Sequence, residues 1–567
     1  MRYLALAIDF DGTLAQDGHV RPETVAALDE LKPTRRLVLV TGRRIPELES
    51  AFPELSLFDR VVAENGAVTF NPATGVVRAL AAPPPDMLLE RLRAANVPFE
   101  TGHAIVALWA PHETDAFTAI AELGLEYWVS FNKGAVMLLP AGHTKATGLE
   151  SALHELGLSP LNAVAMGDAE NDHSMLVSCG LGIAVANAVP ALRLSADVTL
   201  TAGHGEGVEE VAYGLIRDDL RGLDANSNRR LRLGISDGEP VYVSNSEAVV
   251  LVIGASGAGK SSYALGILNA LVSAGYQAVV VDPEGDYCDE KPGVAIVGSA
   301  VWPPTVESLQ PFIHEPRGSV VACLVGAGQA HRRAFLTGLL HYAGEQREAT
   351  GRPHWLMIDE AHQLLYDAQD LRTSLERWPL GNALIVTVYP EALAPAVLQQ
   401  VTHVVALSDA SPEVDRLAVM LGVPSPVSES ETTHRALLWA VGEPTTTSLD
   451  ISGICLPHTR HARKYAEGDL GPGGSFYFHQ AGTDRVTRAR NILDFATRLQ
   501  TIDEATWRFH QDRGDFARWL RECIRDETLA EIAEAAAAVP DFRSGQSKLR
   551  EGILARYCSR PDAELSR

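Results

Sequence analysis

The sequence predicts an α/β protein with two parallel-sheet domains, followed by a small helical region. Short β-branched segments alternate with helical patterns from residue 1 to about 212, and the same alternation returns at about 231–450. Residues 451–567 lack it. A chain of 567 residues is also long for one compact core. We therefore expect several domains.

Composition and charge narrow the classes of protein. Asp and Glu total 72 against 48 Lys and Arg, a net charge of −24, which excludes a generally basic nucleic-acid coat but not a local basic channel. The six cysteines stand singly, as is typical of reduced intracellular proteins. No apolar stretch approaches the roughly 20 residues of a membrane helix, and no export signal is evident. We expect a soluble, cytoplasmic protein without a membrane partner.

The first domain is expected at residues 1–212. Its strands are predicted, in chain order, at 3–8, 36–40, 60–63, 162–166, 182–185 and 197–200. Strands that alternate with helices form a parallel sheet covered by those helices. Residues 79–140 break the alternation and predict an α+β insertion, with helices at 86–95 and 113–123. A polar segment at 213–230 predicts a linker.

Two aspartates follow the first predicted strand. Asp9 and Asp11 lie in DFDGT, so both carboxylates would emerge at the carboxyl edge of the sheet, where ligands bind. One acid can attack phosphorus while the other moves a proton. Two close carboxylates repel each other unless a divalent cation lies between them. On its own, this motif also fits a strand followed by an acidic turn.

Three further motifs follow in order. Thr41 begins TGR after the second strand, Lys145 precedes a predicted helix, and GDAEND at 167–172 follows the fourth strand. A hydroxyl and an ammonium can neutralise phosphoryl oxygens, while Asp168 and Asp172 can complete a magnesium shell. The four motifs together indicate phosphoryl chemistry.

With these motifs in order, residues 1–212 resemble phosphatases of the haloacid dehalogenase (HAD) superfamily, of the Cof-like branch, and ENGA at 64–67 fits that branch. The resemblance implies that Asp9 forms an aspartyl-phosphate, that Asp11 is the general acid and base, and that Thr41 and Lys145 hold the phosphoryl group. It implies a substrate-phosphate site of Gly42, Arg43 and Asn171, and a Mg²⁺ site of Asp9, Asp11, Asp168 and Asp172, with Asn171 and Asp172 also orienting Lys145 and metal-bound water.

The third motif departs from the family pattern. Family members commonly have Gly directly after the lysine, whereas Ala146 and Thr147 precede Gly148 here. The inserted cap, at about 79–140, would choose the substrate, a small phosphorylated metabolite such as a sugar phosphate or phosphoglycolate. Candidate contacts in the cap are His103, Trp109, His112 and Lys133, each of which equally fits a surface or core position.

The second domain is expected at 231–450. Its strands are predicted at 247–253, 277–281, 319–325, 354–358, 382–388 and 403–407. The segment GASGAGKSS, between the first of these and a helix, matches the P-loop that cradles ATP phosphates. Its nucleotide-binding residues would be Gly254, Ser256, Gly257, Gly259, Lys260, Ser261 and Ser262, with Ser261 also on Mg²⁺. Asp359 would hold Mg²⁺ through water, and Glu360 would polarise the attacking water, which favours ATP hydrolysis over simple binding.

The segment QAVVVDPEGDY at 277–287 makes this domain resemble HerA/FtsK-type ATPases, a group that includes DNA translocases. That resemblance implies a sensor at the end of the strand at 382–388, where we align Val388 with the family's polar residue. Candidates for an arginine finger, or simply for a solvated helix face, are Arg332, Arg333, Arg372 and Arg377. A homo-oligomer, such as a hexamer, is implied because the finger often comes from a neighbouring subunit.

Residues 451–567 contain no catalytic motif, and helices are predicted at 486–500, 503–511 and 514–538. The sequence therefore favours a Mg²⁺-dependent phosphomonoester hydrolase fused to an ATPase that regulates or assembles it. Two alternatives stay open. One is a nucleic-acid motor with an accessory phosphatase, against which the net charge and Val388 argue. The other is a kinase-phosphatase acting on nucleic-acid ends, against which Glu360 argues. A scaffold with two inert sites is the least favoured reading.

Overall fold

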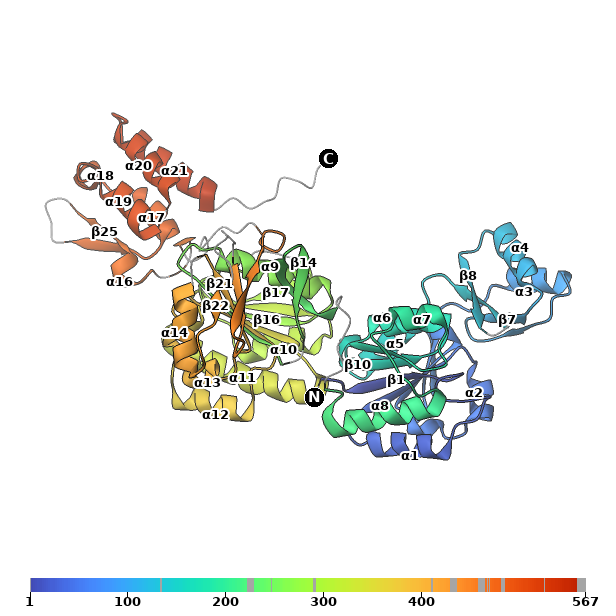
Figure 1. Cartoon of the computed structure of the whole chain (residues 1–567). Helices are drawn as coiled ribbons and strands as arrows, with labels where there is room; N and C mark the ends of the chain where they lie inside the picture. The colour runs from blue at the N-terminus through green and yellow to red at the C-terminus, as the bar shows by residue number, and fades with distance from the viewer. Residues whose placement is uncertain are drawn as a thin grey trace.

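The computed structural model contains two α/β domains, a cap on the first domain and a small C-terminal domain (Figure 1). The cap and the C-terminal domain lie at opposite ends of the molecule, with the two large sheets between them. The residues that the structure describes are 2–132, 135–221, 229–245, 247–288, 292–408, 411–428, 436–456, 465–466, 468, 470–480, 485–524 and 526–557.

The first domain is built on an eight-stranded sheet of order β12-β11-β10-β1-β2-β3-β4-β5. Its strands are β1 (Ala5–Asp9), β2 (Arg36–Val40), β3 (Arg60–Ala63), β4 (Val68–Asn71), β5 (Val76–Ala79), β10 (Ala163–Gly167), β11 (Leu181–Ala184) and β12 (Val198–Thr199). The strands from β12 to β3 are parallel, whereas β4 and β5 form an antiparallel edge. The predicted parallel sheet is thus confirmed.

Helices cover both faces of this sheet. They are α1 (Pro22–Leu31), α2 (Ile45–Ala51), α5 (Lys145–Glu155), α6 (His173–Ser178), α7 (Pro190–Ser195) and α8 (His204–Asp218). Because successive side chains of a strand point to opposite faces, Leu6 and Ile8 of β1 pack into one apolar core and Ala5 and Ala7 into the other. Helix α8 packs along α1 and ends at Asp218, beyond residue 212, where the sequence analysis ends the domain.

The cap is a four-stranded antiparallel sheet of order β6-β7-β9-β8 with two helices on one face. Its elements are α3 (Asp86–Ala94), β6 (Phe99–Thr101), β7 (Val106–Trp109), α4 (Glu113–Leu123), β8 (Tyr127–Asn132) and β9 (Ala135–Pro140). Val136 and Leu138 of β9 pack against α3 and α4, so Met137 and Leu139 point to the other face, toward the first domain. The predicted α+β insertion has this form.

The second domain has a ten-stranded sheet of order β17-β18-β16-β19-β20-β15-β21-β23-β24-β22. Its strands are β15 (Val249–Ile253), β16 (Ala278–Asp282), β17 (Val294–Val297), β18 (Ser319–Cys323), β19 (Trp355–Ile358), β20 (Ala383–Val386), β21 (His403–Leu407), β22 (Val427–Ser428), β23 (Ala436–Ala440) and β24 (Thr445–Leu449). Those from β17 to β21 are parallel, and a hairpin of β13 (Leu231–Ser236) and β14 (Glu239–Val243) precedes them.

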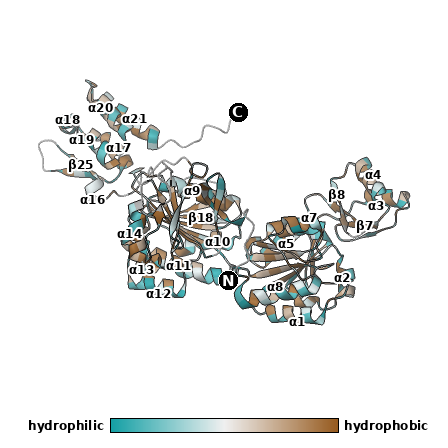
Figure 2. Ribbon diagram, in the orientation of Figure 1, coloured by the Kyte–Doolittle hydropathy of each residue, from teal (hydrophilic) through white to brown (hydrophobic). Residues whose placement is uncertain are grey.

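The helices of the second domain are α9 (Lys260–Ser273), α10 (Val306–His314), α11 (Gln329–Thr350), α12 (Gln369–Arg377), α13 (Pro395–Leu398) and α14 (Ser411–Leu421). Its central strands are apolar on both faces, as expected for a parallel sheet between two helical layers. Figure 2 shows this as brown strands inside teal-sided helices. The six strands predicted from sequence all appear, and the α/β fold class is confirmed.

The C-terminal domain differs from the prediction at several elements. Residues 486–489, expected to begin a helix, form strand β26 (Val486–Ala489), which pairs antiparallel with β25 (Phe476–His479). Helix α17 (Ile492–Leu499) begins only after Asn491, whose side chain caps it. Further helices are α18 (Glu504–Gln511), α19 (Asp515–Trp519), α20 (Glu527–Ala537) and α21 (Phe542–Tyr557), of which α21 was not predicted. In the part of the chain described here, no helix has the length and apolar character to cross a membrane.

Candidate active sites

Lys145 joins two carboxylates at the carboxyl edge of the first sheet. Its Nζ lies 2.5 Å from Oδ1 of Asp9 and 2.6 Å from Oδ1 of Asp172. Asp9 ends β1, whereas Asp172 follows β10 in a single 3₁₀ turn. All three side chains are nearly inaccessible to solvent. Burial favours the neutral lysine, but the two carboxylates outweigh it and raise the pKa of Lys145 well above its usual value. The ammonium is therefore charged wherever the enzyme is folded near neutral pH.

The departure noted in the third motif leaves this lysine in place. Lys145 is the first residue of α5, and Thr144 caps the helix by accepting a hydrogen bond from the N–H of Thr147. Thr147 reciprocates by accepting the N–H of Thr144 at 2.9 Å. A Cβ on Gly148 would lie 2.5 Å from the Cα of Gly66, so glycine is required where α5 crosses the turn after β3. Thr144 and Thr147 thus cap helix α5, and Gly148 allows α5 to approach the turn after β3 closely.

Three buried carboxylates could hold a divalent cation. Oxygens of Asp9, Asp168 and Asp172 all lie within 4.8 Å of one another. Both oxygens of Asp172 are engaged, one by Lys145 and the other by the N–H groups of residues 168 and 169. Burial, and then the neighbouring Asp172, raise the pKa of Asp9 despite Lys145, a cost that a cation would offset. Among the described residues, the buried side-chain oxygen of Asn171, which precedes Asp172 in the chain, has no hydrogen-bond partner, and oxygen donors of these kinds fit Mg²⁺.

The carboxylate of Asp11 forms an ion pair with Arg43. Nε and Nη2 of Arg43 donate to its two oxygens at 2.8 and 2.6 Å, a two-point ion pair. The N–H of Arg43 also donates to the buried hydroxyl of Thr41 at 3.1 Å. Gly42, between them, is close to Met137 of the cap, 3.1 Å from a Cβ placed there. The TGR motif therefore contacts both Asp11 and the cap.

The P-loop of the second domain lies between β15 and α9. Gly254, Gly257 and Gly259 have φ of 150°, 88° and 92°, values that side chains disfavour, so the loop needs glycine there. Nζ of Lys260 donates to the carbonyl oxygens of Gly254 and Ala255 at 3.0 and 2.9 Å. Ser261 and Ser262 follow it in the first turn of α9, and Ser256 lies within the loop. The loop is thus shaped to surround an anion with backbone N–H groups.

Asp359 and Glu360 follow β19. Strand β20 lies between β19 and β15, the strand that precedes the P-loop. Burial, and then Asp286 and Glu360, raise the pKa of Asp359 well above its usual value. Its Oδ2 is buried and has no hydrogen-bond partner among the residues that the structure describes, which fits a carboxylate that binds a hydrated cation. Glu360 has a left-handed backbone, with φ of 43°, and its Oε2 lies 3.5 Å from Nδ1 of His362.

A buried polar side chain, that of Thr387, directly follows β20. Thr387 is fully buried, and its hydroxyl lies 3.2 Å from Nδ1 of His362, the ring that also approaches Glu360. Val388, which we aligned with the sensor, comes one residue later. Thr387 is therefore a second candidate for the sensor position, beside Val388.

The comparisons with known proteins agree with this geometry. Residues 6–80 and 110–211 match the family model of haloacid dehalogenase-like hydrolases, and residues 236–312 match the central domain of helicase HerA. A phosphoglycolate phosphatase of Natronomonas pharaonis is 32% identical over 220 residues, which are 36% of this chain and 94% of that protein. The chain belongs to the haloacid dehalogenase-like hydrolase family. The predicted fusion of this hydrolase to a HerA-like domain is likewise confirmed.

Two further similarities concern the hydrolase domain alone. The phosphoglycolate phosphatase of Haloarcula marismortui is 33% identical over 220 residues, again 36% of this chain and 94% of that protein. A haloacid dehalogenase-like hydrolase from Bacteroides thetaiotaomicron, known by crystal structure, aligns with 38% of this chain and 99% of its own at 20% identity and a TM-score of 0.34.

In this hydrolase, a buried glutamate pins the cap to the sheet. Glu64, in the ENGA segment, is fully buried and accepts hydrogen bonds from the N–H groups of residues 103, 104 and 105 at 2.9, 2.9 and 3.3 Å. Beside it, Nδ2 of Asn65 lies 2.8 Å from the sulfur of Met137, and Nδ2 of Asn171 donates to Oδ1 of Asn65. The inner face of the cap sheet is thereby linked, through Asn65, to Asn171 in the fourth motif. This contact of Glu64 with the cap was not predicted from the sequence, although the ENGA segment was identified there.

The proposed substrate contacts of the cap fall into different surroundings. Trp109 is 46% exposed and lies on the same face of the cap sheet as Met137, as does Trp128, which is 52% exposed and was not predicted. His103 is beside Glu64, and His112 pairs with Asp115 at 3.0 Å near the start of α4. Lys133 lies outside the described residues.

The four candidate finger arginines of the HerA-like domain are all engaged within the chain. Arg332 donates to the carbonyl oxygens of Pro283, Leu324 and Ala327. Arg333 pairs with Asp370, and Arg372 with Asp367. Arg377 lies over the ring of Trp378, with 5.3 Å from its guanidinium carbon to the ring centroid. A role in a neighbouring subunit would require each of these contacts to break.

Proposed function

We propose that this hydrolase is a Mg²⁺-dependent phosphomonoester phosphatase that works through an aspartyl-phosphate on Asp9. The observation that carries the proposal is the buried Asp9–Lys145–Asp172 arrangement at the carboxyl edge of the sheet, with Asp168 beside it. The Asp9 carboxylate attacks phosphorus and the bond to the alcohol oxygen breaks. Asp11 gives that oxygen a proton and later takes one from the water that hydrolyses the acyl phosphate.

The remaining polar groups hold the phosphoryl oxygens. Lys145, which burial and two carboxylates keep in place, offers its charge, and the buried hydroxyl of Thr41 offers a hydrogen bond. Asp9 and Asp168 would hold Mg²⁺, which when bound supplies positive charge to the reacting phosphate. Asp172 orients Lys145, since both of its oxygens are already occupied.

Within this proposal, the alcohol released is an uncharged ring, as in a sugar phosphate, rather than glycolate. Trp109 and Trp128 present flat apolar surfaces on the inner cap face. The described cap strands carry no Lys or Arg, and the two arginines of α3 contact Glu122 and the ring of Phe99. A carboxylate would therefore meet no free cation from the described cap. The relatives named phosphoglycolate phosphatase make glycolate the alternative substrate group.

We further propose that the HerA-like domain hydrolyses ATP with Mg²⁺ and regulates or assembles the phosphatase. The glycine-dependent P-loop, Lys260 and the buried Asp359 support nucleotide binding, and Glu360 supports activation of water. A DNA-dependent motor is the second candidate, supported by the similarity to the helicase HerA central domain. Stimulation of ATP hydrolysis by duplex DNA, weakening steeply with salt, would favour the motor.

The proposal is tested by release of nitrophenol from an aryl phosphate in Mg²⁺, with and without ATP. Asp9→Asn should lower the rate by about a thousandfold or more, whereas Asp17→Asn, at an exposed loop position, should not. If ATP changes the rate of the wild type but not of Lys260→Ala, the ATPase regulates the phosphatase. Release that does not depend on Asp9 would refute the phosphatase mechanism.

A further inference from the structure

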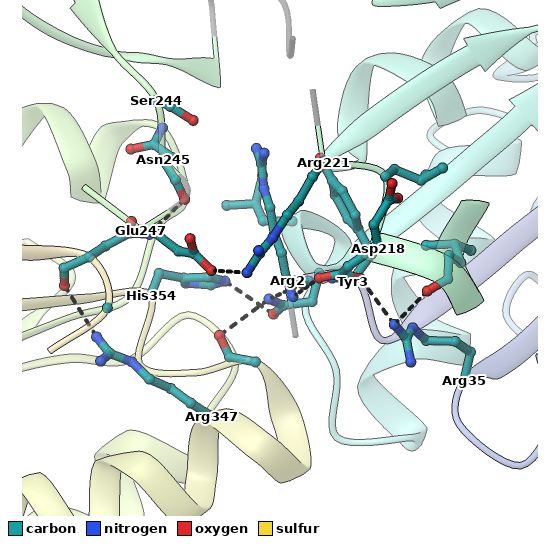
Figure 3. A pocket seen from close by; sticks show the side chains of 18 of the residues that line it. Arg2, Tyr3, Arg35, Asp218, Arg221, Ser244, Asn245, Glu247, Arg347 and His354 are labelled. Carbon is teal, nitrogen blue, oxygen red and sulfur yellow. Dashed lines mark hydrogen bonds and ion pairs between the residues drawn. The ribbon is translucent and has the colours of Figure 1, made fainter. Parts of the chain in front are cut away.

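A cavity of about 1140 Å³ lies between the two α/β domains, away from both active sites (Figure 3). On the phosphatase side, Arg2 and Tyr3 precede β1, and residues 215–221 end α8. On the ATPase side, Asn245 precedes β15 and His354 precedes β19. The walls thus come from the amino ends of strands, whereas Asp9 and Asp359 lie at the carboxyl ends.

Arginine is the only strongly basic residue in the lining, which has five arginines and no lysine. Four of the five guanidinium groups form ion pairs or hydrogen bonds with other residues of the chain. Arg35 pairs with Asp219 at 3.1 Å, Arg221 with Glu247 at 2.9 Å, and Arg217 with Asp218 at 3.2 Å. Arg347 donates to three backbone carbonyl oxygens, those of residues 353, 380 and 382. These contacts fix the walls and leave one arginine to consider.

In the described part of the chain, no ion pair engages the guanidinium of Arg2. Among the described residues its guanidinium contacts only the ring of Tyr3, at 4.9 Å from the centroid, and Figure 3 shows its side chain extending into the cavity. A guanidinium stacked on a ring keeps its N–H groups free at the edge. The carboxylate of Asp219, which also lines the cavity, instead accepts hydrogen bonds from the backbone N–H groups of Arg2 and Tyr3 and from the side chain of Arg35.

Tyr3 supplies a second unused donor in the same wall. The residue is 2% exposed, and its hydroxyl has no hydrogen-bond partner among the described residues. A buried hydroxyl left unpaired is costly, so such a group usually marks a bound water or ligand. Burial raises the pKa of Tyr3 to about 12, and the hydroxyl therefore keeps its proton at neutral pH. Both unused groups are donors that need an acceptor.

We propose that this interdomain cavity binds a small phosphate-bearing anion, held by the guanidinium of Arg2 and the hydroxyl of Tyr3. Arginine offers the planar pair of N–H groups that matches two phosphate oxygens, and the tyrosine hydroxyl adds a third hydrogen bond. The volume is sufficient for a ligand as large as a nucleotide. Because both domains line the cavity, the bound anion stabilises their observed arrangement.

The test uses the full chain with both active sites disabled by Asp9→Asn and Lys260→Ala. Pyrophosphate is titrated calorimetrically without Mg²⁺, and ADP is titrated in parallel. Binding to one site is expected. Arg2→Ala should weaken it by about tenfold or more and Tyr3→Phe by about threefold, since the first removes a charged contact and the second a single hydroxyl. Arg78→Ala, at an exposed arginine on β5, is the control and should change nothing.

Each outcome decides the proposal. Tighter binding of ADP than of pyrophosphate, lost in Arg2→Ala, identifies a nucleotide as the phosphate source, whereas equal binding identifies the phosphates alone. The proposal is overturned if neither pyrophosphate nor ADP binds with a dissociation constant of millimolar or below. It is also overturned if Arg2→Ala and Tyr3→Phe leave the binding unchanged. Circular dichroism of each variant confirms that it is folded, and Tyr3→Phe keeps the buried ring. The site is independent of the proposed chemistry, because the test needs neither activity.

Discussion

Nε2 of His354 lies 3.1 Å from Oδ1 of Asn162, and this hydrogen bond joins the amino ends of β19 and β10 across the two domains. Nδ1 of His354 accepts the backbone N–H of Gln277 at 2.9 Å, so Nε2 carries the proton and donates to Asn162. Nδ2 of Asn162 in turn donates to the carbonyl oxygens of Arg2 and Gly351. The strands that end in Asp168 and Asp359 thus share one buried junction.

Asn162→Ala should destabilise the whole chain. It leaves Nε2 of the fully buried imidazole without an acceptor, at a cost of about 1–3 kcal/mol in the free energy of unfolding. Denaturation in urea measures the change. The same variant should also weaken any effect of ATP on the phosphatase rate, because it removes a shared contact. Asn71→Ala, in the β4–β5 hairpin away from the junction, is the control. Unchanged stability and coupling would show that the hydrogen bond is dispensable.

The junction should also make stability depend on pH. Burial, and then Arg352, lower the pKa of His354 to about 3, against about 6.5 in an unfolded chain. Below pH 6.5 the unfolded state therefore takes up a proton that the folded state refuses, and stability falls as pH falls toward 3. The loss approaches about 1.4 kcal/mol per pH unit. His354→Gln, which does not titrate, should flatten the profile between pH 6.5 and 4, whereas His341→Gln, at an exposed position, should leave it unchanged.

Arg43→Ala distinguishes two possible roles of Arg43, positioning Asp11 and binding the substrate phosphate. The structure places Arg43 on Asp11, so its loss should lower kcat by about 10- to 100-fold, with little change in KM. Contact with the substrate phosphate instead predicts a rise in KM. Steady-state kinetics on an aryl phosphate distinguish the two. Arg43→Lys keeps the charge but not the two-point contact, and should recover only part of the rate.

Trp109→Ala and Trp128→Ala should each raise KM for a hexose phosphate by about fivefold and leave KM for phosphoglycolate unchanged. Phe117→Ala is the matched control, because Phe117 is an equally exposed aromatic residue on helix α4, outside the inner face. Preference of the wild type for phosphoglycolate, lost in Lys133→Ala, would contradict the uncharged-ring proposal without affecting the phosphatase mechanism.

Thr387→Val should slow ATP hydrolysis by about threefold to tenfold and leave nucleotide affinity unchanged, because it removes the hydrogen bond to His362, near Glu360, and the one accepted from the N–H of Tyr389. Val388→Ala, at the position first aligned with the sensor, should have little effect. Multiple-turnover ATPase assays with separate binding titrations give both numbers. The reverse pattern would restore Val388 as the residue that faces the nucleotide.

The sequence predicted those features that local patterns determine. Asp9, Lys145 and Asp168 could be placed because each follows or precedes a strongly apolar strand or a helix in motif order. Features that depend on distant pairing could not. Val486–Ala489 has a helix-compatible sequence, but Phe476–His479 pairs with it as a strand.

Three contacts of the two sites could not be predicted for the same reason. They are the hydrogen bonds of Glu64 to residues 103–105, the ion pair of Asp11 with Arg43, and the contact of Thr387 with His362. Each brings together residues that are far apart in sequence or depends on where a strand stops. The junction of Asn162 with His354 links two domains through uncharged side chains, and no motif marks it.

The two domains meet at the amino ends of β10 and β19, whereas Asp168 and Asp359 directly follow the carboxyl ends of these strands. The lengths of both strands therefore lie between the two sets of acidic residues. Any influence of one site on the other would be carried by a shift of these strands at their shared junction, and not by contact between the reacting groups.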